Sequence, residues 1–144
     1  MNSQDIHHIR EFDRFYTRIF RLTDKYHLQT TLTLLEARLL LEIAENGYNT
    51  ANQLVQVLRV DKGYLSRILK RLEERGLLAQ TPAELDKRSK ILSLTDAGNE
   101  QLAIINQRSD DQVRSLFTNL TSSETKQVIS AMQFIEEHVT KIKE

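Results

Sequence analysis

One segment, residues 61–76, concentrates side chains that can bond an anionic ligand, and these side chains recur at helical spacing. They are Lys62, Tyr64, Ser66, Arg67, Lys70 and Arg71, and Gly63 lies among them. Guanidinium and ammonium groups can bond the O6 and N7 atoms of guanine and attract phosphates, and hydroxyl groups can bond bases or phosphates. The glycine, which has no Cβ, would let a helix backbone approach such a ligand closely. These residue types are suited to a nucleic-acid partner.

Charge is unevenly distributed along the chain, although the formal net charge is zero. Residues 59–90 hold nine Lys/Arg against five Asp/Glu, a balance of +4, and they include a second cationic cluster at Lys87, Arg88 and Lys90. Residues 1–58 balance at −1 and residues 91–144 at −3. Phosphate attraction depends on the local field, so a local excess of positive charge can suffice for a nucleic-acid partner even when the net charge is zero. Charge alone leaves open a solvated helix face.

The basic segment also has an apolar side, which predicts a helix packed against a core. Four apolar residues recur at i, i+3, i+4 and i+7, the spacing of one helix face: Leu65, Ile68, Leu69 and Leu72. We expect this helix to span residues 61–75, with Asp61 as its N-cap and Gly76 at its end. A helix buried on one side and cationic on the other is suited to the major groove of DNA.

A short helix is expected just before the basic one, with room only for a tight turn between them. Thr50 and Gln53 form a capping box, in which each side chain bonds the backbone of the other residue. The buried face of this short helix is expected at Ala51, Leu54, Val55 and Leu58. Two short helices joined in this way, with the second one basic, predict a helix-turn-helix.

Two apolar runs, residues 77–81 and 91–94, predict a hairpin whose tip, residues 82–90, contains Pro82 and the second cationic cluster. The remaining helices are expected over residues 4–26, from Thr33 to Asn46-Gly47, over residues 95–119 and from Thr121 onward. Thr33 with Glu36 and Thr121 with Glu124 are again capping boxes. The predicted fold class is mainly α with a small β-hairpin wing, a winged helix-turn-helix of six helices.

We expect a single domain with two functional parts. Residues 30–95 would form the winged-helix DNA-binding lobe, and residues 1–29 and 96–144 the dimerisation helices. The terminal helices carry long apolar stripes and have too little core to cover in so small a domain. We therefore expect a homodimer whose two recognition helices lie about 34 Å apart on double-stranded DNA. The alternative is that these stripes bury each other within one chain.

Composition and short motifs argue against several other classes of function. With 144 residues the chain fits one domain, and no cysteine is present for a disulfide or a thiolate zinc site. The four histidines form no helical metal-binding pair. Without a nucleophile elbow, a phosphate loop or a dinucleotide fingerprint, we expect neither enzyme activity nor a cofactor. No signal peptide or membrane-spanning run is evident, which favours a cytoplasmic protein with no membrane partner.

Three motifs and the order of the expected elements resemble the MarR family of winged-helix transcription regulators. The motifs are Leu72-Glu-Glu-Arg-Gly-Leu-Leu78, Asp86-Lys-Arg-Ser-Lys90 and Leu92-Ser-Leu-Thr-Asp-Ala-Gly98. They are similar to that family's leucine–glutamate helix end, Asp-x-Arg wing tip and Leu-Thr-x-x-Gly strand exit, and the resemblance covers nearly the whole chain. It implies a homodimeric, ligand-responsive regulator of a pseudo-palindromic operator, as a repressor rather than an activator.

The resemblance also implies roles for individual residues. Arg88 matches the family's wing arginine, which enters the minor groove, where narrow A·T tracts concentrate negative potential. Asp86 matches the partner that holds this arginine by a charge-assisted hydrogen bond, and Lys87 and Lys90 add phosphate attraction. Gln80 departs from the family, which often places an arginine on this strand, and one phosphate contact is therefore in doubt.

In the same family an effector commonly lies between the dimer helices and the DNA-binding lobe. The positions in this chain that correspond to such a pocket are Phe12, Phe15, Tyr16, Arg38 and Leu41. A core stripe explains Phe12 and Tyr16 equally well, so both interpretations of these two aromatic residues stay open. The resemblance thus implies a small-molecule effector as a third partner, beside DNA and a second copy of the chain.

Two segments, Phe12-Asp-Arg-Phe-Tyr-Thr-Arg18 and Asp61-Lys-Gly-Tyr-Leu-Ser-Arg67, are similar to the regulatory half of proteins that fuse a MarR-like domain to an N-acetyltransferase. Because the sequence ends at Glu144, we expect no such catalytic domain. Two alternatives to DNA reading stay open. One is a winged-helix interaction module that modulates a separate protein, such as an acetyltransferase. The other is an enzyme whose catalytic domain lies outside these residues.

Overall fold

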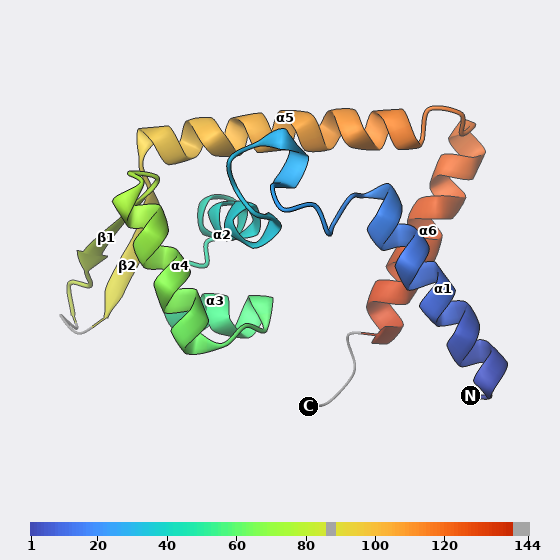
Figure 1. Ribbon diagram of the computed structural model, residues 1–144, viewed down its shortest axis with the longest axis horizontal. Helices are drawn as coiled ribbons and strands as arrows, with labels where there is room; N and C mark the ends of the chain where they lie inside the picture. Colours follow the sequence, from blue (N-terminus) through green and yellow to red (C-terminus); the bar gives the residue numbers. More distant parts are fainter. Residues whose placement is uncertain (86–88, 140–144) are drawn as a thin grey trace. The chain divides into compact units, whose positions relative to one another are not determined.

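The computed structural model describes residues 1–85 and 89–139, which contain six α-helices and one β-hairpin (Figure 1). The elements are α1 (Ser3–Ile19), η1 (His27–Gln29), α2 (Leu34–Ala44), α3 (Ala51–Leu58), α4 (Lys62–Glu74), β1 (Leu78–Pro82), β2 (Lys90–Leu94), α5 (Asp96–Leu116) and α6 (Ser122–Val139). The chain divides into two compact units, Met1–Ser109 and Asp110–Glu144, and the boundary in the sequence falls within α5. The predicted fold class is confirmed. The assignment of a DNA-binding lobe and dimerisation helices stays a prediction.

The core of the first unit is built mainly from leucine and isoleucine. Its most buried side chains come from α2 and the residues before it, from α3 and α4, and from β1: Leu32, Leu39, Leu40, Leu54, Leu65, Ile68, Leu72 and Leu78. α4 contacts α3 and β1, and α2 contacts β2, so these elements share one core. Each such side chain contributes about 1.5–3 kcal/mol when fully buried, and this burial fixes α4 against the hairpin.

The three predicted capping boxes are confirmed. The Thr33 hydroxyl accepts from the Glu36 N–H at 3.2 Å, and the Glu36 carboxylate accepts from the Thr33 N–H at 2.9 Å. Equivalent pairs begin α3, at Thr50 and Gln53, and α6, at Thr121 and Glu124. Each box satisfies backbone N–H groups that have no acceptor within the first helical turn. The starts of these helices are therefore fixed by local sequence.

Several element ends differ from the sequence-based prediction. α1 ends at Ile19 rather than near residue 26, because Arg21 adopts a left-handed conformation with φ of 53°. Its guanidinium bonds the carboxylate of Asp24 at 2.8 Å, which stabilises the turn after the helix. No glycine or proline marks this end, so the apolar period did not reveal it. Pro82, expected in the loop, is the last residue of β1 and pairs with Lys90.

The hairpin is attached to the helix-turn-helix along β2. Leu78 of β1 pairs with Leu94 of β2, and Gln80 pairs with Leu92. The Leu92 N–H also donates to the carbonyl of Asn49, at 2.7 Å. Asn49 lies between α2 and α3, two residues before the first residue of α3. This backbone bond places the start of α3 next to the wing.

α5 begins directly against the junction between α4 and β1. The Thr95 N–H donates to the carbonyl of Leu77 at 3.2 Å, and the Thr95 hydroxyl accepts from the Gly98 N–H at 3.1 Å. Gly98 is buried, and a Cβ added there would overlap the carbonyl oxygen of Leu77. The Leu-Thr-x-x-Gly motif therefore has a packing cause: only a glycine allows this close approach of helix and chain.

We expect Gly98→Ala to destabilise the protein by about 1–3 kcal/mol, the usual cost of overpacking, because a backbone carbonyl cannot rotate away from the new methyl group. Chemical unfolding of the purified variant measures this change. Asn99→Ala, at the next and exposed position of the same helix, is the matched control. Equal stability of the two variants would contradict the close approach at Gly98.

Residues 27–33, which we call the connector, lead into α2 and contain a strained turn. Leu28 and Gln29 both adopt left-handed conformations, with φ of 52° and 59°. Such a conformation costs about 1–2 kcal/mol for each residue that has a Cβ. The His27 N–H donates to the carbonyl of Leu32 at 2.7 Å, which closes the connector into a loop, and the Leu32 side chain is fully buried. Surrounding contacts must therefore offset the strain.

His27, at the start of the connector, is half-buried. Burial lowers its pKa, the charge of Arg38 lowers it further, and Asp24 acts in the opposite direction. Because the folded-state pKa is lowered, the unfolded chain binds more protons near the ordinary histidine pKa of about 6.5. The stability associated with neutral His27 is thus fully present above that pH and is lost as the pH falls below it.

We expect His27→Gln to reduce the loss of stability between about pH 7.5 and pH 5.5, because the variant has no imidazole to protonate at this position. Thermal unfolding of wild type and variant across this range measures the effect. His8→Gln, which removes an exposed histidine of α1, serves as the control. An identical pH dependence in wild type and His27→Gln would show that His27 protonation is not linked to folding.

Candidate DNA-binding surface

α4 presents two faces that differ in composition and burial. The predicted apolar side is confirmed, because Leu65, Ile68, Leu69 and Leu72 are all buried. The α4 residues expected to contact DNA are exposed: Lys62, Gly63, Tyr64, Ser66, Arg67, Lys70 and Arg71. As predicted, Asp61 is the N-cap, and its carboxylate accepts from the Tyr64 N–H at 2.9 Å. Gly76, with φ of 75°, follows the C-terminal end. α4 is therefore anchored along one side and exposes a cationic side to solvent.

Arg67 is constrained by two neighbours on the exposed side of α4. Its guanidinium carbon lies 5.9 Å from the centre of the Tyr64 ring, a cation–π contact. Gly63 is its second neighbour: a Cβ added there would lie 3.6 Å from Nη1 of Arg67, an ordinary van der Waals contact, and 3.3 Å from Oδ2 of Asp61. An arginine whose rotamer is already restricted loses less freedom when its planar fork bonds a pair of acceptors. This geometry suits the O6 and N7 acceptors of guanine.

A hollow of about 390 Å³ lies on the exposed side of α4. It is lined by Tyr64, Arg67, Lys70, Arg71 and Glu74. Three cationic side chains against one carboxylate give this hollow a positive field that attracts anionic ligands. The structure thus brings together three of the cations that the sequence analysis assigned to the major groove.

A second hollow, of about 530 Å³, lies between α4, the hairpin and the start of α3. Its lining residues are Thr50, Ala51, Asn52, Ser66, Leu69, Gln80, Ser89, Lys90 and Leu92. Ser66 and Lys90, predicted from two separate motifs, therefore line one hollow. Thr50 and Asn52 are additional polar residues that the sequence analysis did not assign to this surface. The capping box indicated where α3 begins, but not that this end lies beside the wing.

The strand that enters the wing contacts α4 through a side-chain amide. Nε2 of Gln80 donates to Oε2 of Glu73 at 3.0 Å. At this position the amide therefore links β1 to α4. Lys90 begins β2 and is exposed. The predicted site residues Asp86, Lys87 and Arg88 lie outside the described residues.

The five residues predicted for an effector pocket belong to α1 and α2. Phe12 and Phe15 are 49% and 47% exposed, and the ring centres of Phe12 and Tyr16 are 5.9 Å apart. Arg38 is exposed on α2, where its charge lowers the pKa of His27, and Leu41 packs against the core. Neither hollow described above is lined by any of these residues. The effector pocket stays a prediction.

The arrangement of these elements defines a class of protein. A cationic helix anchored by its apolar side, preceded by a short helix and followed by a hairpin, is a winged helix-turn-helix. Among the residues that the structure describes, no group of three or more His, Cys, Asp or Glu side chains is placed to hold a metal ion. No described helix is long and apolar enough to cross a membrane.

Comparison with known proteins identifies the family. Residues 30–89 match the model of the MarR family. The multiple antibiotic resistance protein MarR of Salmonella typhimurium is 33% identical over 105 residues, which cover 72% of this chain and 73% of that protein. The uncharacterized HTH-type transcriptional regulator YybA of Bacillus subtilis is 28% identical over 93 residues, covering 65% of this chain and 61% of that protein.

A solved structure supports the same assignment. The crystal structure of a mutant MarR from E. coli complexed with operator DNA has a TM-score of 0.74 and 27% identity to this chain, covering 92% of this chain and 96% of that one. The chain therefore belongs to the MarR family of winged helix-turn-helix, DNA-binding transcriptional regulators. This family assignment agrees with the class of protein that the sequence analysis expected.

We expect Arg67→Ala to weaken binding to a specific DNA site by roughly 1–3 kcal/mol and to relax base preference at one position, because the bidentate fork is lost. Binding to a panel of single-base variants of the site measures both effects. Arg21→Ala, which removes the same charge from an exposed Arg–Asp pair after α1, is the control. Unchanged base preference in Arg67→Ala would remove this residue from direct readout.

Proposed function

We propose that the chain is a homodimeric repressor that reads a pseudo-palindromic operator with α4 and the wing and responds to a small-molecule effector. The observation that best supports this proposal is the two-sided character of α4. Its apolar residues are buried in the core, and seven residues suited to bases and phosphates are exposed on its other sides. The related MarR of E. coli, which was crystallised with operator DNA, has the same fold.

Within this proposal the two hollows contact different parts of the DNA, one the bases and the other the phosphate backbone. Arg67, Lys70 and Arg71 would face base edges in the major groove from the hollow on the exposed side of α4. The second hollow presents hydroxyl, amide and ammonium groups of three elements, including Thr50, Ser66 and Lys90, which would bond the phosphate backbone. Phosphate contacts would set the register of α4 in the groove, while the arginines would read bases.

A homodimer is supported by the apolar residues that this single chain leaves exposed. α1 has no buried residue, and its apolar stripe includes Ile6, Ile9 and Phe12, which are 48%, 56% and 49% exposed. In the second unit, α6 also has no buried residue, and Phe134 is 62% exposed. Exposed apolar stripes on long helices indicate surfaces that a partner covers, and a twofold dimer would match a near-palindromic site.

An effector would act by preferring one of two arrangements of the recognition helices. A ligand held near Phe12, Phe15, Tyr16, Arg38 and Leu41 would contact α1 and α2, away from the cationic side of α4. It would weaken operator binding only by as much as its affinities for the two arrangements differ. This part of the proposal rests on the family resemblance and on the exposure of the α1 aromatic residues.

Fluorescence anisotropy with DNA from upstream of the protein's own gene tests the proposal directly. We expect tighter binding to this DNA than to a shuffled sequence of equal length, with one dimer per site. Affinity should fall steeply with salt, because each phosphate contact releases condensed counterions. The same titration with the shuffled DNA supplies the non-specific reference at every salt concentration.

Two results would contradict the proposal. Equal and weak affinity for both DNAs, over a panel of upstream fragments, would argue against an operator reader and favour the winged-helix interaction module. Binding as a monomer at concentrations where the specific complex is saturated would argue against the dimer, while leaving DNA recognition by α4 intact.

A further inference from the structure

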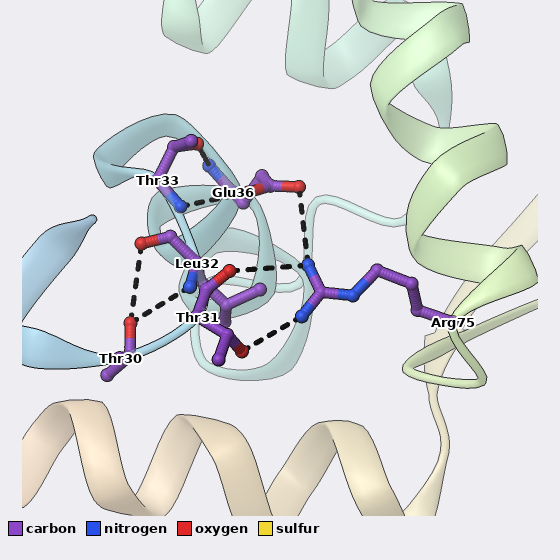
Figure 2. Close-up of polar contacts among 6 residues, drawn as sticks. All are labelled: Thr30, Thr31, Leu32, Thr33, Glu36 and Arg75. Carbon is purple, nitrogen blue, oxygen red and sulfur yellow. Dashed lines mark hydrogen bonds and ion pairs between the residues drawn. The ribbon is translucent and has the colours of Figure 1, made fainter. Parts of the chain in front are cut away.

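Arg75, which follows the last turn of the recognition helix, contacts residues just before and within the first turn of α2 (Figure 2). Its Nη2 donates to the Thr31 hydroxyl at 2.9 Å, and its Nη1 lies 3.5 Å from the Thr31 carbonyl oxygen. Nη1 also lies 3.8 Å from Oε2 of Glu36. The Arg75 N–H donates to the Arg71 carbonyl at 3.0 Å, so the backbone of this residue belongs to the end of α4. One side chain therefore joins α4 to the connector and to α2.

Glu36, one of the groups that Arg75 reaches, is a charged side chain in the buried part of the first unit. It is 7% exposed, whereas the charged residues of the DNA-binding side of α4 are exposed. One carboxylate oxygen, Oε1, accepts from the Thr33 N–H, and the other, Oε2, faces Arg75. A buried carboxylate that loses its cation is left uncompensated, so separation of Arg75 from Glu36 is costly. This pairing favours a single position of the end of α4 relative to α2.

A second arginine holds the other side of the connector. Nη1 of Arg108, from α5, donates to the carbonyls of Leu28 and Gln29 at 2.9 and 2.8 Å. These are the two residues with left-handed backbone conformations. Within the connector, the Thr30 hydroxyl donates to the His27 carbonyl and accepts from the Leu32 N–H. These hydrogen bonds of Thr30 thus link the strained turn, which Arg108 contacts, to Thr31, which Arg75 contacts.

We propose that Arg75 is a positioning residue for DNA recognition, which transmits the state of the connector to the end of the recognition helix. The proposal rests on the proposed function of α4 as the operator reader, and it adds a route by which that reader is regulated. With Arg108 bonded, the strained turn is held, Thr31 and Glu36 stay in place, and Arg75 fixes α4. A change that releases the turn, whether at α5 or between α1 and α2, releases Thr31 and lets α4 shift.

Hydrogen exchange without DNA tests the coupling itself. Arg108→Met removes both bonds to the strained turn and lies on a different helix from α4. We expect exchange of the amides at residues 72–77, the end of α4, to accelerate by roughly fivefold or more, together with those of the connector. Arg21→Met removes an equal charge from an exposed ion pair, at a residue that is itself left-handed, and should leave both segments unchanged. Faster exchange confined to the connector would overturn the proposal.

A second, milder variant keeps the test valid if Arg108→Met does not fold. Thr31→Val removes the hydroxyl acceptor of Arg75 without leaving a buried charge, because Glu36 and Arg75 are both retained. It should accelerate exchange at the end of α4 in the same direction as Arg108→Met. Unchanged exchange at residues 72–77 in Thr31→Val, at a temperature where the variant is fully folded, would also count against the proposal.

DNA binding provides the functional readout. Arg75→Met should reduce the ratio of affinities for specific and shuffled DNA by roughly fivefold or more, while affinity for shuffled DNA and the salt slope match those of Arg21→Met. A merely structural loss of folded protein would lower both affinities equally and leave the ratio unchanged. Arg75→Lys, which keeps the charge but not the planar fork, should restore part of the ratio.

The two proposals fail in distinguishable ways. An unchanged ratio in Arg75→Met, with wild type preferring its specific DNA, overturns the positioning role and leaves the operator-reading function standing. Wild type that does not distinguish the two DNAs overturns the operator-reading function and, with it, the role of Arg75 in DNA recognition. The exchange result for Arg108→Met then decides whether the structural coupling of connector and α4 exists.

Discussion

The structure depends above all on the burial of one side of α4. Leu65, Ile68 and Leu72 are almost completely removed from solvent, and they pack in the core that α2, α3 and β1 share. This burial sets which way the helix faces, because a rotation of α4 by one residue would expose leucine and bury arginine or lysine. The cationic side is therefore presented to solvent as a consequence of packing. The hairpin and α5 are then built against the end of this same helix, at Gly76 and Leu77.

Local sequence rules predicted most of the fold because several helices begin or end at residues that are typical of helix ends. Thr33, Thr50 and Thr121 each begin a helix with a partner three residues later, and Gly76 follows the end of α4 with a positive φ. The periodicity of apolar residues alone predicted the end of a helix less reliably. It carried α1 beyond Ile19, since Arg21 leaves the helical conformation without any glycine or proline to mark the place. Termini with a capping residue were predictable, and a terminus set by one left-handed arginine was not.

The residues that hold the site together were harder to predict than those that face the ligand. The cations of α4 are near one another in sequence, so helical spacing placed them on one side. Thr50 and Lys90 are forty residues apart, and their meeting in one hollow depends on the backbone bond between Asn49 and Leu92. Arg75 and Thr31 are also distant, with a separation of 44 residues. Each of these pairs requires a folded core before it can form, and no local pattern encodes it.

The distribution of charge fits the same division between anchoring and contact. A local excess of +4 at residues 59–90 is balanced by acidic segments on either side, so that the whole chain has no net charge. A uniformly basic protein would attract polyanions over its entire surface, and its non-specific binding would compete with site recognition. Flanking segments with a net negative charge restrict this attraction to residues 59–90. If α4 reads DNA as proposed, specificity would depend on how accurately α4 is held, and the contacts of Arg75 with Thr31 and Glu36 at its end would then contribute to recognition.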